Sequence, residues 1–96
     1  MTVAQTILDQ LGGNKFIAMT GSKNFLSGEK YLSMKLAKNQ SGATQLRIEL
    51  EATDTYKMEF LRCTKKGCST IIICDFVYCD ELQSWFTAVT GLNTSL

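Results

Sequence analysis

Apolar and polar residues alternate along the middle of the chain. Residues 45–53 are the clearest case, because apolar side chains stand at every even position and polar ones at every odd position. Such alternation is typical of a strand with one face buried and the other in water, and short turns between strands favour an antiparallel sheet. Residues 69–77 are apolar at nearly every position, so this strand is expected to be central or covered on both faces. The predicted strands are 15–20, 31–37, 45–53, 56–63 and 69–77.

Apolar residues recur at helical spacing near both ends of the chain. Thr2 and Gln5 form a capping-box pattern before the first helix, which Gly12-Gly13 ends. Asp80 is the predicted N-cap of the second helix, and Gly91 ends it. The apolar stripes are Val3, Ile7, Leu8 and Leu11 in the first helix and Leu82, Trp85, Phe86 and Val89 in the second.

These elements predict a single α+β domain over residues 1–96. The expected order is an N-terminal helix, a four- or five-stranded antiparallel sheet and a C-terminal helix. An amphipathic helix and a one-sided sheet must each bury an apolar face, so both helices are expected on the same face of the sheet, in two layers.

Charge and hydropathy narrow the class of protein. The net charge is +1, whereas a domain that mainly neutralises phosphates is usually strongly basic. The N-terminus lacks the basic and apolar regions of a signal peptide, and no apolar run approaches the roughly 20 residues of a membrane span. We therefore expect a cytoplasmic protein that does not enter the membrane.

The four cysteines are Cys63, Cys68, Cys74 and Cys79. Their spacing does not match the C-x₂-C pairs of structural zinc sites, and the chain has no histidine to complete a mixed site. In a cytoplasmic protein the thiols are expected to be reduced and to behave as small apolar side chains. No metal and no other cofactor is predicted.

Three segments resemble a family of small uncharacterised proteins encoded by phages and other mobile elements. They are LGGNKFIAMTGSKNF (11–25), L-x-I-x-L…D-x-Y-x-x-E-F (46–60) and VYCDELQSWFTAVTGLNTSL (77–96). The resemblance covers nearly the whole chain and implies no activity or catalytic residue. It implies a context in which small proteins often act on a host or defence protein, so the expected partner is a host protein.

A glycine, a hydroxyl and a lysine follow the strand predicted at 15–20. This is not a Walker P-loop, because the spacing G-x₄-G-K-[ST] and the helix that should follow it are missing. The residues predict a bend in solvent, with a weaker functional reading as an anion-binding nest for a phosphate or nucleotide. The candidate anion site is Thr20, Gly21, Ser22, Lys23 and Asn24.

Catalysis is not expected. Without histidine the chain lacks the commonest general base at neutral pH, and a cysteine nucleophile would lack its imidazole partner. The carboxylates on the wet face of the sheet are interpreted as partners in cross-strand ion pairs. They are Glu49, Glu51 and Glu59, with Lys35, Arg47 and Lys57 as the basic partners.

Two binding functions remain open. An antiparallel sheet backed by helices is a common platform for single-stranded nucleic acid, with Lys15, Lys35, Arg47 and Lys57 as the candidate contacts. The mixed signs on the wet face weaken this reading, because a nucleic-acid platform is positive. A protein-interaction module that inhibits a host protein by steric occlusion is therefore preferred, and a nucleotide sponge is the third possibility.

A homodimer is also expected from two features. The apolar strand at 69–77 needs a cover on its second face, which a symmetric partner can provide. In the closing segment, Leu92 and Leu96 are available to dock.

Overall fold

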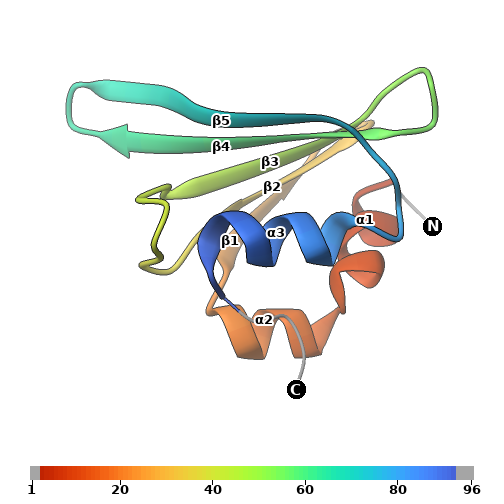
Figure 1. Ribbon diagram of the computed structural model, residues 1–96, viewed down its shortest axis with the longest axis horizontal. Helices are drawn as coiled ribbons and strands as arrows, with labels where there is room; N and C mark the ends of the chain where they lie inside the picture. Colours follow the sequence, from red (N-terminus) through yellow and green to blue (C-terminus); the bar gives the residue numbers. More distant parts are fainter. Residues whose placement is uncertain (1–2, 93–96) are drawn as a thin grey trace.

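The computed structural model describes residues 3–92 (Figure 1). Two short helices open the chain, five strands follow, and a third helix closes it. The elements are α1 (Val3–Leu11), α2 (Asn14–Thr20), β1 (Lys23–Ser27), β2 (Tyr31–Lys35), β3 (Gln45–Leu50), β4 (Tyr56–Thr64), β5 (Gly67–Val77) and α3 (Leu82–Thr90). The α+β fold predicted from the sequence is therefore confirmed, with one helix more than expected.

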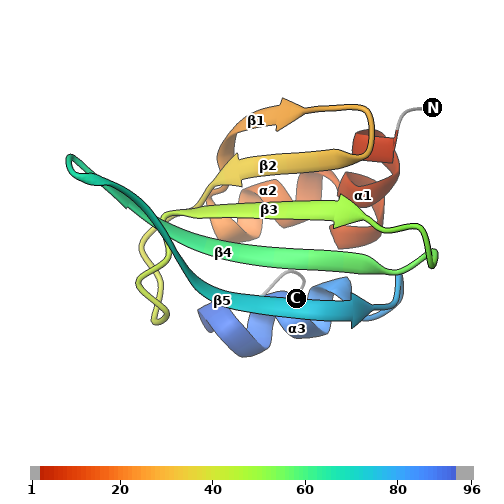
Figure 2. The same ribbon diagram turned by 90° about the horizontal axis from the view of Figure 1, so that it is seen from above.

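The sheet is an antiparallel meander in the order β1-β2-β3-β4-β5, so strands that follow each other in sequence also lie side by side (Figure 2). The three helices lie on one side of it (Figure 1). Beyond Gln45, where β3 starts, β4 and β5 continue as a two-stranded arm (Figure 2). Among residues 3–92 no helix is long and apolar enough to cross a membrane.

The core lies between the sheet and the helices. Side chains at alternate positions of β2, β3 and β4 point into it, which confirms the period-two pattern of the sequence. Phe16 of α2 and Phe86 of α3 meet edge to face, with ring centroids 5.0 Å apart. The largest fully buried side chains include Ile7, Leu11, Phe16, Leu46, Ile48, Met58, Phe60, Leu82 and Phe86.

The prediction of a strand over 15–20 is wrong, because these residues belong to α2. Phe16 and Thr20 are the buried residues of this segment, four positions apart and on one helical face. Gly13 and Gly21 flank the helix with φ of +60° and +69°. The first strand is β1, which begins at Lys23 in a segment that the sequence analysis assigned to a solvent-exposed bend.

The helix ends also differ from expectation. The predicted cap Thr2 and the docking residue Leu96 lie outside the described residues. The N-cap of α3 is Glu81 and not Asp80, and the Glu81 carboxylate accepts a hydrogen bond from the Tyr78 backbone N–H at 3.2 Å. Leu92 is partly buried and packs against the core.

The position of β5 corrects a further prediction. The strand was expected to be central or covered on both faces, yet it forms the outer edge of the sheet. Most of its residues are exposed, including Ile71 and Ile73 at 42% and 49%. An apolar run therefore marks an open edge in this protein and not a buried strand.

The expectation of four reduced cysteines is wrong as well. Cys63 and Cys68 form a disulfide that joins the two strands of the β4–β5 arm, one residue pair away from its turn at 65–66. Cys74 is buried and Cys79 exposed, and both are free thiols.

Alkaline pH is expected to destabilise the fold. Burial, and then the neighbouring Cys79, raise the pKa of Tyr56 above its usual value of 10.0. Burial, and then Asp75, raise the pKa of Cys74 above 9.0. Each group therefore keeps its proton up to a higher pH in the folded chain than in the unfolded chain. Stability from these groups is complete below about pH 9 and falls as the pH rises through their raised folded-state values.

Denaturant unfolding at pH 8 and pH 10.5 measures this loss. The difference in unfolding free energy between the two pH values should shrink in Tyr56→Phe and stay unchanged in Tyr78→Phe, where the ring is exposed. An equal pH dependence in wild type and Tyr56→Phe would show that Tyr56 makes no contribution.

Candidate functional site

The described elements leave the face of the sheet opposite the helices uncovered, and we call it the open face (Figure 1). One row of paired residues crosses it from edge to edge: Leu26, Ser33, Arg47, Glu59 and Ile73. Directly paired residues point to the same side of a sheet, so this row is charged at its centre and apolar at both margins. Leu26 is 66% exposed.

Arg47 lies at the centre of the open face and contacts two of its neighbours there. Its guanidinium binds the Glu49 carboxylate at 3.0 Å and lies 4.1 Å from the centre of the Tyr31 ring. The ion pair runs along β3, whereas the sequence analysis expected pairs across strands. Both partners are about 40% exposed, so solvent screens the pair and it adds little stability. Its effect is to hold a flat aromatic and cationic surface in place.

The basic residues proposed to contact nucleic acid do not all come together. The strand register places Lys35, Arg47 and Lys57 on the open face, opposite Gln45, Glu59 and Glu49 respectively. Lys15 lies in α2, on the other side of the sheet. Glu49 and Glu59 stand among the three remaining cations, so the face carries both signs.

The candidate anion site is adjacent to the C-terminal end of α2. The Thr20 hydroxyl donates to the Phe16 carbonyl at 2.7 Å and lies 2.8 Å from the Ser22 hydroxyl, and both residues are buried. The Gly21 N–H donates to the Ile17 carbonyl. A helix C-terminus carries partial negative charge, which disfavours an anion. Anion binding here stays a prediction, and the Gly21 N–H and the Thr20 and Ser22 hydroxyls already have partners.

The other two residues of that candidate site belong to β1. Lys23 pairs with Lys35, at one edge of the sheet. Asn24 adopts a φ of +55° within the irregular pairing between Lys23 and Leu26. The bend predicted at 20–22 is instead the C-terminal end of α2, and the backbone irregularity lies at Asn24, inside the first strand.

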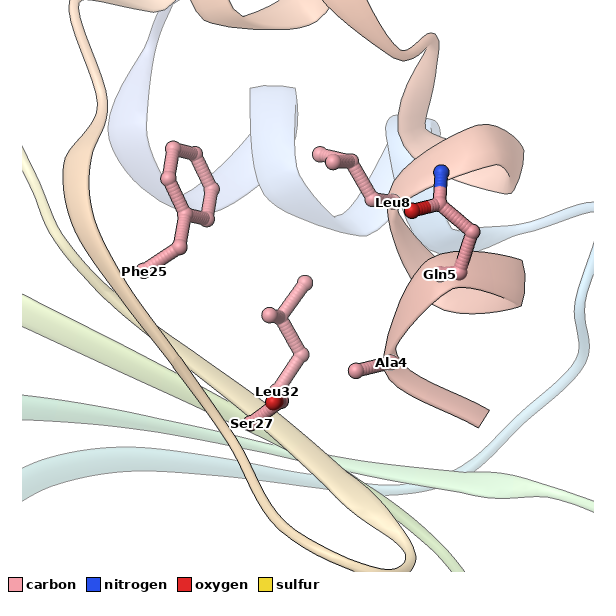
Figure 3. Close-up of a pocket in the computed structure, with 6 residues that line it drawn as sticks. All are labelled: Ala4, Gln5, Leu8, Phe25, Ser27 and Leu32. Atoms are coloured by element: carbon pink, nitrogen blue, oxygen red, sulfur yellow. The ribbon is translucent and has the colours of Figure 1, made fainter. Parts of the chain in front are cut away.

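The hollows on the surface differ in size. One of about 200 Å³ lies between α1 and the β1–β2 edge, where Leu8 and Phe25 approach from opposite sides and Leu32 lies near Ala4 (Figure 3). Drug-sized ligands need about 300–1,000 Å³, so this hollow fits no more than a side chain. The charged centre of the open face encloses only about 40 Å³.

Phe76 lies at the corner where β5 passes the β3–β4 turn. Its side chain is 70% exposed, and with Asp75 and residues 51–53 and 55 it lines a hollow of about 350 Å³. Its backbone φ is +55°, which is strained for a bulky residue. An exposed aromatic ring on a strained backbone points to function, because neither feature stabilises the fold.

Sequence reasoning missed Leu26 and Phe76. Leu26 stands in a short segment with no clear period, and Phe76 sits within an apolar run that favoured burial. One signal for Phe76 was available in the sequence. The charged residue Asp75, directly before it, interrupts the apolar run of 69–77 two residues before its end.

Comparison with known proteins finds no family model, no curated protein and no solved structure that matches the chain.

Proposed function

We propose that the protein is a non-enzymatic binding protein that sequesters or inhibits another protein through its open face. The observation that carries this proposal is the row from Leu26 to Ile73, which is apolar and exposed at both margins and charged at Arg47. Exposed apolar side chains around a stacked arginine and tyrosine are the composition of protein contact surfaces. The resemblance to phage and mobile-element proteins makes a host protein the expected partner.

Single-stranded nucleic acid is the second candidate ligand. The stacked Tyr31 and Arg47 favour it, since bases stack on such groups. Affinity for an oligonucleotide would then fall steeply with salt, because each phosphate contact releases a counterion. Absence of salt-dependent binding would exclude this candidate. A nucleotide sponge, the third, would show as a rise in melting temperature with mono- or cyclic nucleotides.

Affinity capture tests the proposal directly. The tagged protein is incubated with host lysate, with and without nuclease, and the retained proteins are identified by mass spectrometry. A protein retained after nuclease treatment supports the proposal. Loss of every retained protein with nuclease would support the nucleic-acid candidate instead.

Phe76→Gly separates binding from stability. Glycine adopts a φ of +55° without strain, and the exposed ring contributes little burial. The free energy of unfolding is therefore expected to stay equal or to rise by about 1 kcal/mol, while partner capture falls. Asp54→Gly is the matched control, because it relieves a φ of +62° and removes no aromatic ring. A clear loss of stability in Phe76→Gly, or full partner capture by this variant, would contradict a role of the Phe76 ring in binding.

A further inference from the structure

The two edges of the sheet differ in their protection against pairing. The β1 edge is five residues long, begins with Lys23 and is interrupted by an irregularity at Asn24. Short length, lysine and irregular backbone are devices that prevent an edge strand from pairing with another chain. The β5 edge has eleven residues, contains three consecutive isoleucines (71–73) and carries no lysine. Its pairing with β4 shifts register between Thr70 and Ile72 and again between Cys74 and Val77, and the regular segment 72–74 between these shifts remains open to strand addition.

The charges at the two ends of β5 are opposite. Lys65 and Lys66 form the turn before the strand, and Asp75, Asp80 and Glu81 stand near its other end. If two β5 strands lie antiparallel, the basic end of each meets the acidic end of the other, whereas a parallel arrangement would bring like charges together. Antiparallel pairing is also what two-fold symmetry requires.

We propose that two copies of this chain pair β5 to β5 in antiparallel orientation about a two-fold axis near Ile72. This register places Ile71 of each copy opposite Ile73 of the other. The two five-stranded sheets become one continuous sheet. Ile71 and Ile73 of the two copies then lie beside one another at its centre, in cross-strand contact.

The dimer would extend the proposed binding surface. Joining the sheets at β5 brings two open faces side by side, with the apolar Ile73 margin of each in the middle. This inference rests on the geometry of β5 and goes beyond the proposed function, since a monomer with one open face can still bind a partner.

Sedimentation of the purified full chain, at concentrations from micromolar to millimolar, tests the proposal. Wild type is expected at twice the 10.7 kDa chain mass. Ile73→Lys should sediment as a monomer, because it places a charge at the centre of the pairing strands. Leu26→Lys, which changes an exposed apolar residue next to the opposite edge, should remain a dimer.

Charge reversal tests the orientation. Lys65→Glu with Lys66→Glu, and separately Asp80→Lys with Glu81→Lys, should each raise the dimer dissociation constant by roughly tenfold or more, since like charges then meet. Mixing the two variants should restore dimers, because both contacts become attractive again. A wild-type monomer, an open-ended assembly, an Ile73→Lys dimer or no restoration on mixing would overturn the proposal. A monomer that still captures a protein would leave the proposed function intact.

Discussion

Phe86→Ala is expected to lower the free energy of unfolding by about 3–5 kcal/mol, which is the cost of removing a fully buried aromatic ring. Phe86 has no exposed surface, and its ring meets Phe16 at 5.0 Å. This contact joins α3 to α2, so its loss removes core volume and an aromatic pair together. A domain of this kind has a total stability of about 5–15 kcal/mol, so the substitution is expected to remove a large fraction of it.

Trp85→Ala is the matched control, because Trp85 precedes Phe86 in the same helix and is 41% exposed. Chemical unfolding of both variants should show a much smaller loss of unfolding free energy for Trp85→Ala than for Phe86→Ala. Equal losses would show that α3 does not pack against the sheet with the face that the structure assigns to it. The double variant Phe16→Ala, Phe86→Ala should lose less than the sum of the two single variants, since the ring contact can be lost only once.

Reduction of the Cys63–Cys68 disulfide is expected to loosen the β4–β5 arm and leave the core intact. The two cysteines are only five positions apart in the sequence. For so short a loop, the reduced chain entropy of the unfolded state stabilises the fold by about 2 kcal/mol. Most arm residues around it are exposed, so little packing replaces the lost bond. Amide hydrogen exchange between residues 64 and 69 should accelerate by roughly 25-fold, since 1.4 kcal/mol corresponds to a factor of ten.

The variant Cys63→Ser, Cys68→Ser should reproduce the effect without a reductant. Cys79→Ser is the control, because Cys79 is an exposed free thiol outside the arm. Exchange at Leu46 and Ile48, in the centre of the sheet, should change in neither variant. Faster exchange at those core amides would mean that the disulfide stabilises the whole domain.

The sheet could be predicted from the sequence where one face of a strand is buried. Over 45–50 and 56–60 the alternation of apolar and charged residues follows the burial of the side chains, so the fold class follows from it. The helix α3 is predicted for the same reason. In its expected stripe Leu82 and Phe86 are buried, whereas Trp85 is 41% exposed and Thr90, which was not part of the stripe, is buried.

Two elements could not be predicted, for physical reasons. Residues 14–20 form a helix of seven residues, too short to show a complete apolar stripe. The apolar run of β5 is compatible either with burial on both faces or with an exposed edge that a partner covers. Local sequence does not distinguish these two environments, because the choice depends on strand order.

The candidate site shows the same limit. Alternation correctly places Lys35, Arg47 and Lys57 on one face, but Lys15 falls elsewhere because its segment is helical. The apolar margins Leu26 and Ile73 become visible only when the five strands are aligned, since they are far apart in the sequence.

The most direct test of the binding role is quantitative capture with an open-face variant. Leu26→Ser combined with Arg47→Ser changes one margin and the centre of the face, at positions exposed enough for the fold to tolerate both. Trp85→Ala, which alters the helical side, is the control. We predict that wild type and Trp85→Ala retain the same protein after nuclease treatment and that the open-face variant loses it. Equal retention by all three would contradict the assignment of the open face as the binding surface.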